Sequence, residues 1–92
     1  MFPNVFHMNR PNVPEAERAE RVRIGATLRQ IRQMRGFKPD EFANEVGISR
    51  PYLANIEAGR KPLTEVLLAK CAIVLDVGQV VIVREGYFEV AA

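Results

Sequence analysis

The sequence predicts one mainly α-helical domain of four to five helices, with a short β-hairpin at its C-terminal end. Three observations support this fold class. Apolar residues recur at helical spacing along residues 15–77. Prolines, glycines and serines fall where these periodic stretches begin and end. The last segment, QVVIVREGYFEV, is instead rich in β-branched and aromatic residues.

The first helix is expected to follow a flexible leader. Residues 1–14 contain three prolines together with several asparagines, a composition typical of an extended arm. The helix-forming run EAERAERVRIGATLRQIRQMRG comes next, with Ile24, Leu28 and Ile31 at helical spacing. Gly36 is a suitable C-terminal stop.

The second helix is predicted within PDEFANEVG, directly after Lys38. Pro39 suits a first helical turn, and the acids that follow it favour the positive end of a helix. Gly47 ends the segment. Its apolar stripe consists of Phe42, Ala43 and Val46.

The third helix is predicted to begin after Ser49, a good N-cap, and to end near Gly59. Pro51 is tolerated because amides in the first turn have no intrahelical partner. A fourth, strongly apolar helix is expected in LTEVLLAKCAIVLDV, between Pro62 and Gly78.

Residues 78–92 are predicted to form two short strands joined at Glu85-Gly86. Both faces of VVIV are apolar, which favours a strand pair that dimerises, since a large exposed apolar patch usually implies a partner. The dimer contacts would come from Val81, Ile82, Val83, Tyr87 and Phe88. The alternative is a fifth helix or a strand that simply packs on the core.

Composition excludes several classes of function. The 92 residues suffice for one domain, and one cysteine and one histidine support neither a disulfide framework nor a metal site. No apolar run approaches the roughly 20 residues of a membrane span, and the start does not resemble a secretory signal, so a cytoplasmic protein is expected. No catalytic constellation or phosphate loop is present, so we expect neither an enzyme nor a cofactor.

Charge is unevenly distributed along the chain. Residues 1–38 carry eight Arg or Lys against three Glu, whereas residues 39–92 carry five against eight Asp or Glu. The basic segment would suit a phosphate-rich partner, or it would be a solvated helix face.

Residues 39–58, PDEFANEVGISRPYLANIEA, combine a short helix, a turn at Gly47 and a second short helix, with a small Ala43 where the helices approach. This pattern resembles the helix-turn-helix of the Cro and phage-repressor type, the lambda-repressor-like fold, over about residues 23–77. The resemblance implies that the second helix of the pair enters the major groove of DNA.

The resemblance also implies roles for individual residues. Base reading would fall to Arg50, Pro51, Tyr52 and Asn55, and phosphate binding to Lys38, Ser49, Arg60 and Lys61. Ser49 is either a cap alone or also a phosphate donor. Arg29 and Arg35 lie either near phosphates or in solvent.

A structural ion pair between Arg32 and Glu57 is implied by the same resemblance. Three positions depart from the usual pattern. Pro39 stands where many relatives carry a bracing Gln, Pro51 removes a base-reading side chain, and Ala58 replaces a common Asn. The affinity for DNA is therefore expected to depend more on phosphate contacts and on DNA shape than it does in those relatives.

The sequence thus predicts a sequence-specific regulator that binds double-stranded DNA, most simply a small repressor of the phage, mobile-element or antitoxin kind. A homodimer would place its reading helices about one DNA turn, roughly 34 Å, apart. The alternative is a protein-interaction module of the same shape that binds a toxin, a coactivator or a polymerase subunit. A steep salt dependence of DNA binding would separate the two.

Overall fold

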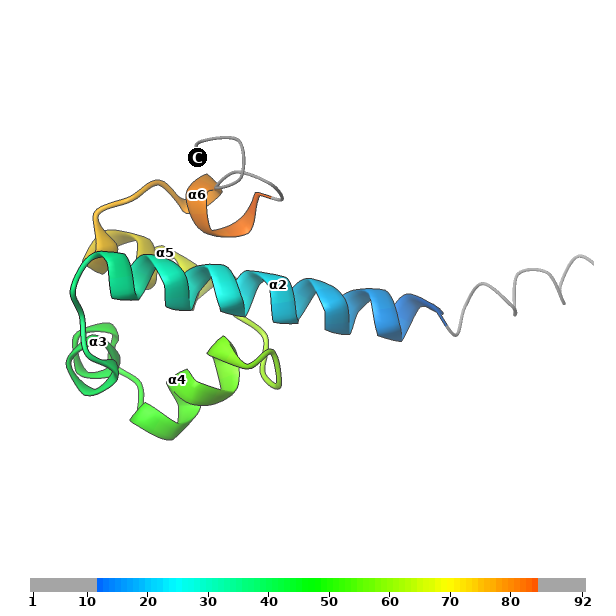
Figure 1. The fold of residues 1–92 in the computed structure, drawn as a ribbon, viewed down its shortest axis with the longest axis horizontal. Helices are drawn as coiled ribbons and strands as arrows, with labels where there is room; N and C mark the ends of the chain where they lie inside the picture. The colour runs from blue at the N-terminus through cyan, green and yellow to red at the C-terminus, as the bar shows by residue number, and fades with distance from the viewer. Residues whose placement is uncertain (1–11, 85–92) are drawn as a thin grey trace, which may run out of the picture.

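The computed structural model describes residues 12–84, which form five helices (Figure 1). Helix α2 spans Asn12–Met34, α3 spans Pro39–Val46 and α4 spans Arg50–Glu57. Helix α5 spans Glu65–Leu75 and the short α6 spans Gln79–Val83. In the view of Figure 1, α3 and α4 lie below the long α2 and α6 lies above it. The expected mainly α-helical bundle is therefore confirmed.

Local capping chemistry sets the boundaries of the short helices. Gly47 ends α3 in the left-handed region, with φ of 92°, which glycine adopts without steric cost. The Ser49 hydroxyl oxygen then accepts a hydrogen bond from the Tyr52 amide at 3.1 Å and so caps α4. Thr64 caps α5 in the same way, through the Leu67 amide at 3.3 Å. The predicted starts of α3 and α4 are thereby confirmed.

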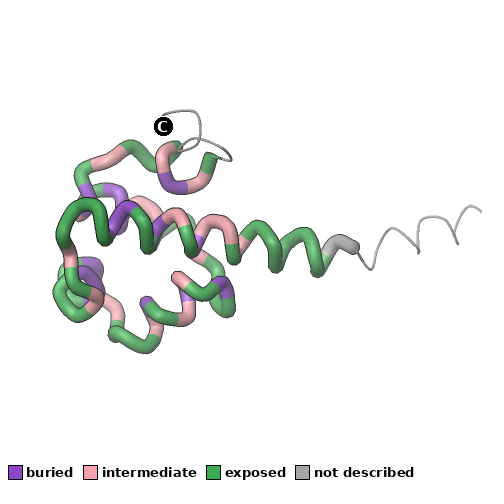
Figure 2. The backbone as a smooth tube through the Cα atoms, viewed as in Figure 1, coloured by how far each residue is buried: buried purple, intermediate pink, exposed green. Residues whose placement is uncertain are grey.

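One apolar core joins all five helices. Its most deeply buried large side chains come from every helix, and they include Leu28, Phe42, Leu53, Leu75 and Ile82. The N-terminal part of α2 makes no such contribution, because residues 14–20 are all exposed (Figure 2). The first turns of α2 therefore extend beyond the body of the domain.

Helix α2 approaches the C-terminal end of α4 very closely. A Cβ atom on the buried Gly25 would lie 2.3 Å from the Ile56 carbonyl oxygen and 2.7 Å from that of Glu57. A Cβ on Gly59 would lie 2.6 Å from a methyl group of Val22. Only glycine fits at these two contacts, so the pair fixes how near α4 lies to α2.

Residues 79–83 form helix α6, so the strand predicted for VVIV is wrong, and no strand occurs among residues 12–84. Helix α6 packs against α2 and α5, and its Ile82 side chain is fully buried. The Arg23 guanidinium donates to the Val83 carbonyl at 2.7 Å, which satisfies one backbone group at the helix end. Burial of one face of α6 therefore outweighs the β propensity of residues 79–83. The remainder of the expected hairpin lies outside the described residues.

The burial of Ile82 also corrects the expected dimer interface. A side chain with 0% exposure inside the domain core cannot contact a second copy of the chain. Val81 and Val83 are half-buried and pack against the same core. Tyr87 and Phe88, the other expected interface residues, lie outside residues 12–84.

The first helix begins earlier than the sequence indicates. Helix α2 starts at Asn12, within the segment expected to be a leader, and Pro14 lies in its first turn. Proline is compatible with that position because first-turn amides have no intrahelical partner. Residues 1–11 of the expected leader lie outside the described part of the chain.

Candidate nucleic-acid interface

The N-terminal turn of α4 presents the residues expected to read bases. Arg50 and Pro51 are exposed, and Tyr52 is half-buried with part of its ring packed against the core. Because Leu53 and Ile56 are buried on the opposite side, the orientation of α4 is fixed by the core. The polar face of this helix is therefore held in one direction relative to the rest of the domain.

Asn55 organises the loop that follows α4. Its backbone carbonyl accepts hydrogen bonds from the amides of Arg60 and Lys61 at 2.9 and 3.2 Å. Its side-chain Oδ1 also accepts from Arg60 Nε at 2.7 Å. A bidentate contact to adenine needs both the oxygen and the nitrogen of the amide. Adenine would therefore have to share Oδ1 with Arg60 or displace it, a constraint that the sequence does not reveal.

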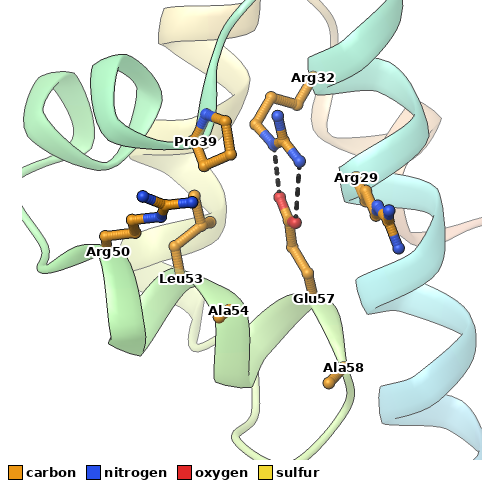
Figure 3. Close-up of a pocket in the computed structure, with 8 residues that line it drawn as sticks. All are labelled: Arg29, Arg32, Pro39, Arg50, Leu53, Ala54, Glu57 and Ala58. Carbon is orange, nitrogen blue, oxygen red and sulfur yellow. Dashed lines mark hydrogen bonds and ion pairs between the residues drawn. The ribbon is translucent and has the colours of Figure 1, made fainter.

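A buried ion pair joins α2 to α4, and it is the Arg32–Glu57 pair implied by the resemblance. Arg32 Nε lies 2.7 Å from Glu57 Oε2 and Nη2 lies 3.1 Å from Oε1, a bidentate arrangement (Figure 3). Arg32 Nη1 also donates to the Phe37 carbonyl at 2.9 Å. Since Arg32 is only 4% exposed, this network braces the reading helix from inside the domain.

This pair also lines a pocket of about 280 Å³, which lies between α2, the start of α3 and the length of α4 from Arg50 to its C-cap Ala58 (Figure 3). It is lined by three arginines, one carboxylate and apolar or small side chains: Arg29, Arg32, Pro39, Arg50, Leu53, Ala54, Glu57 and Ala58. The charges of Arg32 and Glu57 compensate each other. Arg29 and Arg50 supply further positive charge at this pocket, although the Asp40 carboxylate, 3.3 Å from Arg50, offsets part of it, and the remaining charge suits an anion.

Lys38 and Ser49 lie at the two helix starts that border this pocket. The Lys38 amide donates to the Glu41 carboxylate at 3.2 Å, which leaves the exposed Lys38 ammonium available at the surface. Ser49 caps α4 through its oxygen, and its hydroxyl proton remains available as a donor. Both expected phosphate contacts therefore remain open to a ligand.

Asp40 was not predicted from the sequence to lie beside the residues of α4, and the surroundings of Arg29 were left undecided. Arg29, for which the sequence left open a place near phosphates or in solvent, is exposed and lines the pocket. The structure also places Asp40 beside Arg50, with Arg50 Nε 3.3 Å from Asp40 Oδ1. The ten-residue separation of these two side chains gives no local signal, because the contact depends on the angle between α3 and α4.

A second exposed feature is an apolar strip that we call the α5 surface. It consists of Val66, Ala69 and Ile73 on one face of α5, with Val77 at its end. Ile73 is 78% exposed and Val66 is 65% exposed, although both are large and apolar. Helix α5 is apolar on nearly all sides, so the sequence alone does not show which face meets the core.

No helix of residues 12–84 is both long and apolar enough to cross a lipid bilayer.

Comparisons with known proteins agree with this geometry. The helix-turn-helix domain family matches residues 23–83. The ImmF control region 10 kDa protein of Bacillus phage phi105 is 32% identical over 77 residues, which are 76% of this chain and 86% of that protein.

Two solved structures of gene regulators are also similar. The restriction-modification controller protein C.AhdI from Aeromonas hydrophila has a TM-score of 0.67 and 28% identity, over 70% of this chain and 97% of that one. The clp gene regulator ClgR from Corynebacterium glutamicum has a TM-score of 0.70 and 30% identity, over 78% of this chain and 77% of that one. The chain therefore belongs to the helix-turn-helix domain family, and it is a small DNA-binding transcriptional regulator.

Proposed function

We propose that this regulator recognises a specific double-stranded DNA operator by placing the N-terminal turn of α4 in the major groove. The observation that supports this most strongly is the direction of α4. Its apolar side is fixed in the core and its Glu57 is braced by Arg32, so Arg50 and Pro51 are exposed at its start, while Asn55 is half-buried farther along. A rigidly held helix start is what base reading requires.

Arg50 is the main candidate for direct reading of a base. Its guanidinium can give a bidentate pair to the O6 and N7 acceptors of guanine. Tyr52 can contact a thymine methyl group or a phosphate. Pro51 has no hydrogen-bonding side chain, so at its own position it can recognise DNA only by shape and apolar contact. Asn55 contributes either to a base or, through Arg60, to the position of the phosphate contacts.

Phosphate contacts would flank the reading helix on both sides. Lys38 and Arg29 lie toward α3 and α2, while Arg60 and Lys61 follow the C-terminal end of α4. Each Lys or Arg that neutralises a phosphate releases counterions, so the affinity should fall steeply with salt. Arg29 is added here to the contacts implied by the resemblance, because it borders the pocket beside Arg50.

The operator would be bound by a homodimer that associates through the α5 surface. This strip includes the exposed Val66 and Ile73, and burying it in a symmetric contact would remove apolar area from water. Two copies related by a two-fold axis would then read an inverted repeat. Occupying such an operator would repress transcription by excluding polymerase.

The test is selection of bound sites from a random DNA pool by the purified protein at near-physiological salt. The account expects enrichment of an inverted repeat whose half-sites lie about one helical turn apart. Arg50→Ala should lose preference at one position of each half-site, whereas Arg84→Ala, which removes the same charge from the residue that follows α6, should not. Absence of any enriched sequence would contradict the proposal and favour a protein-interaction module.

A further inference from the structure

An acidic side chain lies within the proposed DNA-binding surface. Asp40 is in the first turn of α3, and its Oδ1 is 3.3 Å from Nε of Arg50, in the first turn of α4. The two side chains are 70% and 64% exposed. A carboxylate at this position would repel the phosphates of a bound duplex, so its presence needs a reason other than affinity.

Folding stability does not supply that reason. Exposed ion pairs contribute little to stability, because water screens them and because two mobile side chains must be ordered. Asp40 already has a favourable place in the first turn of α3, where the helix end is positive. The more informative consequence of the contact is therefore its effect on the direction of the Arg50 guanidinium.

The atoms used by the contact leave the reading edge of Arg50 free. The ion pair brings Asp40 Oδ1 to Nε, and neither Nη1 nor Nη2 of Arg50 donates a hydrogen bond among residues 12–84. Those two nitrogens can donate side by side to the two acceptors of guanine. An exposed arginine samples many rotamers, so a contact that holds Nε lowers the entropy lost when the guanidinium binds.

The same carboxylate would also weaken binding to incorrect sequences. In an unrelated duplex, no guanine lies at the position that Arg50 would read. The Asp40 carboxylate then partly cancels the attraction of Arg50 to phosphates. Repulsion then lowers the affinity for all DNA, while the guanine contact restores affinity only at the correct site. Specificity is the difference between the two binding free energies, so a repulsion common to all DNA cancels from it, and specificity rises only because the positioned guanidinium gains more at the correct guanine than elsewhere.

We propose that Asp40 is a positioning residue for Arg50, which directs the guanidinium toward guanine and disfavours non-specific DNA. This inference rests on the proposed function. Pro39 stands where many relatives carry a Gln that braces the reading helix, and we assign that role to Asp40, the next residue of α3.

The test compares full-length Asp40→Asn with Glu45→Gln, which removes the same charge from an exposed position on the same helix. Fluorescence anisotropy at one salt concentration gives the affinity of each protein for the selected operator, for single-base variants of it and for an unrelated duplex. Asp40→Asn should reduce the preference for the guanine assigned to Arg50 by roughly fivefold or more. A bidentate contact provides discrimination of about 5- to 150-fold in total.

Three further results are expected from the same measurements. Binding of Asp40→Asn to the unrelated duplex should be equal to or tighter than that of the wild type. Asp40→Glu should recover part of the preference, and Glu45→Gln should retain all of it. In an Arg50→Ala background, Asp40→Asn should cause no additional loss of preference.

The proposal is overturned if Asp40→Asn keeps the wild-type preference for that guanine. It is also overturned if the variant alters a base that Arg50→Ala leaves unaffected, because Asp40 would then read DNA itself, as an acceptor for cytosine. An equal loss of affinity for all duplexes would indicate a purely structural role. If the wild-type protein selects no DNA sequence, the proposed function itself is contradicted. That outcome is observed with the wild-type protein alone, before any variant is compared.

Discussion

Replacing Glu57 with alanine should strongly destabilise the domain, because it leaves the charge of Arg32 buried without its carboxylate. Two hydrogen bonds are lost, from Nε at 2.7 Å and from Nη2 at 3.1 Å. One bond, from Nη1 to the Phe37 carbonyl at 2.9 Å, remains. Arg32 is only 4% exposed, so water can replace the lost carboxylate only in part, from the side of the pocket that Arg32 lines.

The expected magnitude follows from that burial. Removing one partner of a buried ion pair costs about 3–5 kcal/mol. A domain of this size has a total stability at the lower end of about 5–15 kcal/mol. With a urea slope of about 1.5 kcal/mol per M, a loss of 3 kcal/mol lowers the unfolding midpoint by about 2 M.

Urea unfolding followed by circular dichroism measures this shift. Two controls separate the buried charge from other effects. Arg29→Ala, on an exposed face one turn away, should shift the midpoint by less than about 0.3 M. Arg32→Met combined with Glu57→Leu should be more stable than Glu57→Ala, because no unpaired charge is left inside. A loss below about 1 kcal/mol for Glu57→Ala would refute the reasoning.

Three other predictions concern packing, titration and association. Gly25→Ala should cost more than about 2 kcal/mol, despite the better helix propensity of alanine, because the new Cβ would lie 2.3 Å from a carbonyl oxygen of α4. Gly78→Ala, with its nearest neighbour at 4.0 Å, should change stability by less than about 0.5 kcal/mol in the same urea assay. Burial raises the pKa of the Cys71 thiol from 9.0 to about 12. The unfolded chain therefore releases this proton first, so the contribution of the thiol to stability should be constant below pH 9 and decline between pH 9 and 12, a decline that Cys71→Ala should remove. Ile73→Glu, on the α5 surface, should give a folded monomer by sedimentation, whereas Ile82→Glu should unfold.

Much of the helix-turn-helix could be predicted because its signals are local. Pro39, Gly47 and Ser49 mark where α3 and α4 begin and end, and each acts through its own backbone or cap. The apolar stripes on the same two helices predict their buried faces correctly. The Arg32–Glu57 pair came from the resemblance, since nothing in the spacing of residues 25 positions apart requires it.

The features that the sequence did not reveal depend on tertiary placement. Residues 79–83 have strand-like composition, but the site for Ile82 between α2 and α5 decides in favour of a helix. The contacts of Asp40 with Arg50 and of Asn55 with Arg60 depend on side-chain directions after folding. The exposure of Ile73 could not be predicted from the sequence, because α5 carries apolar residues on several sides.

The most direct test of the proposed DNA contact is an NMR titration of the labelled protein with its selected duplex. We expect the largest amide shift changes at the N-terminal turns of α3 and α4 and in the loop after α4, including Asp40, Arg50 and Arg60. Raising the salt concentration should reverse these changes. Changes concentrated instead on the exposed N-terminal half of α2 or on α6, with α4 unaffected, would contradict the account.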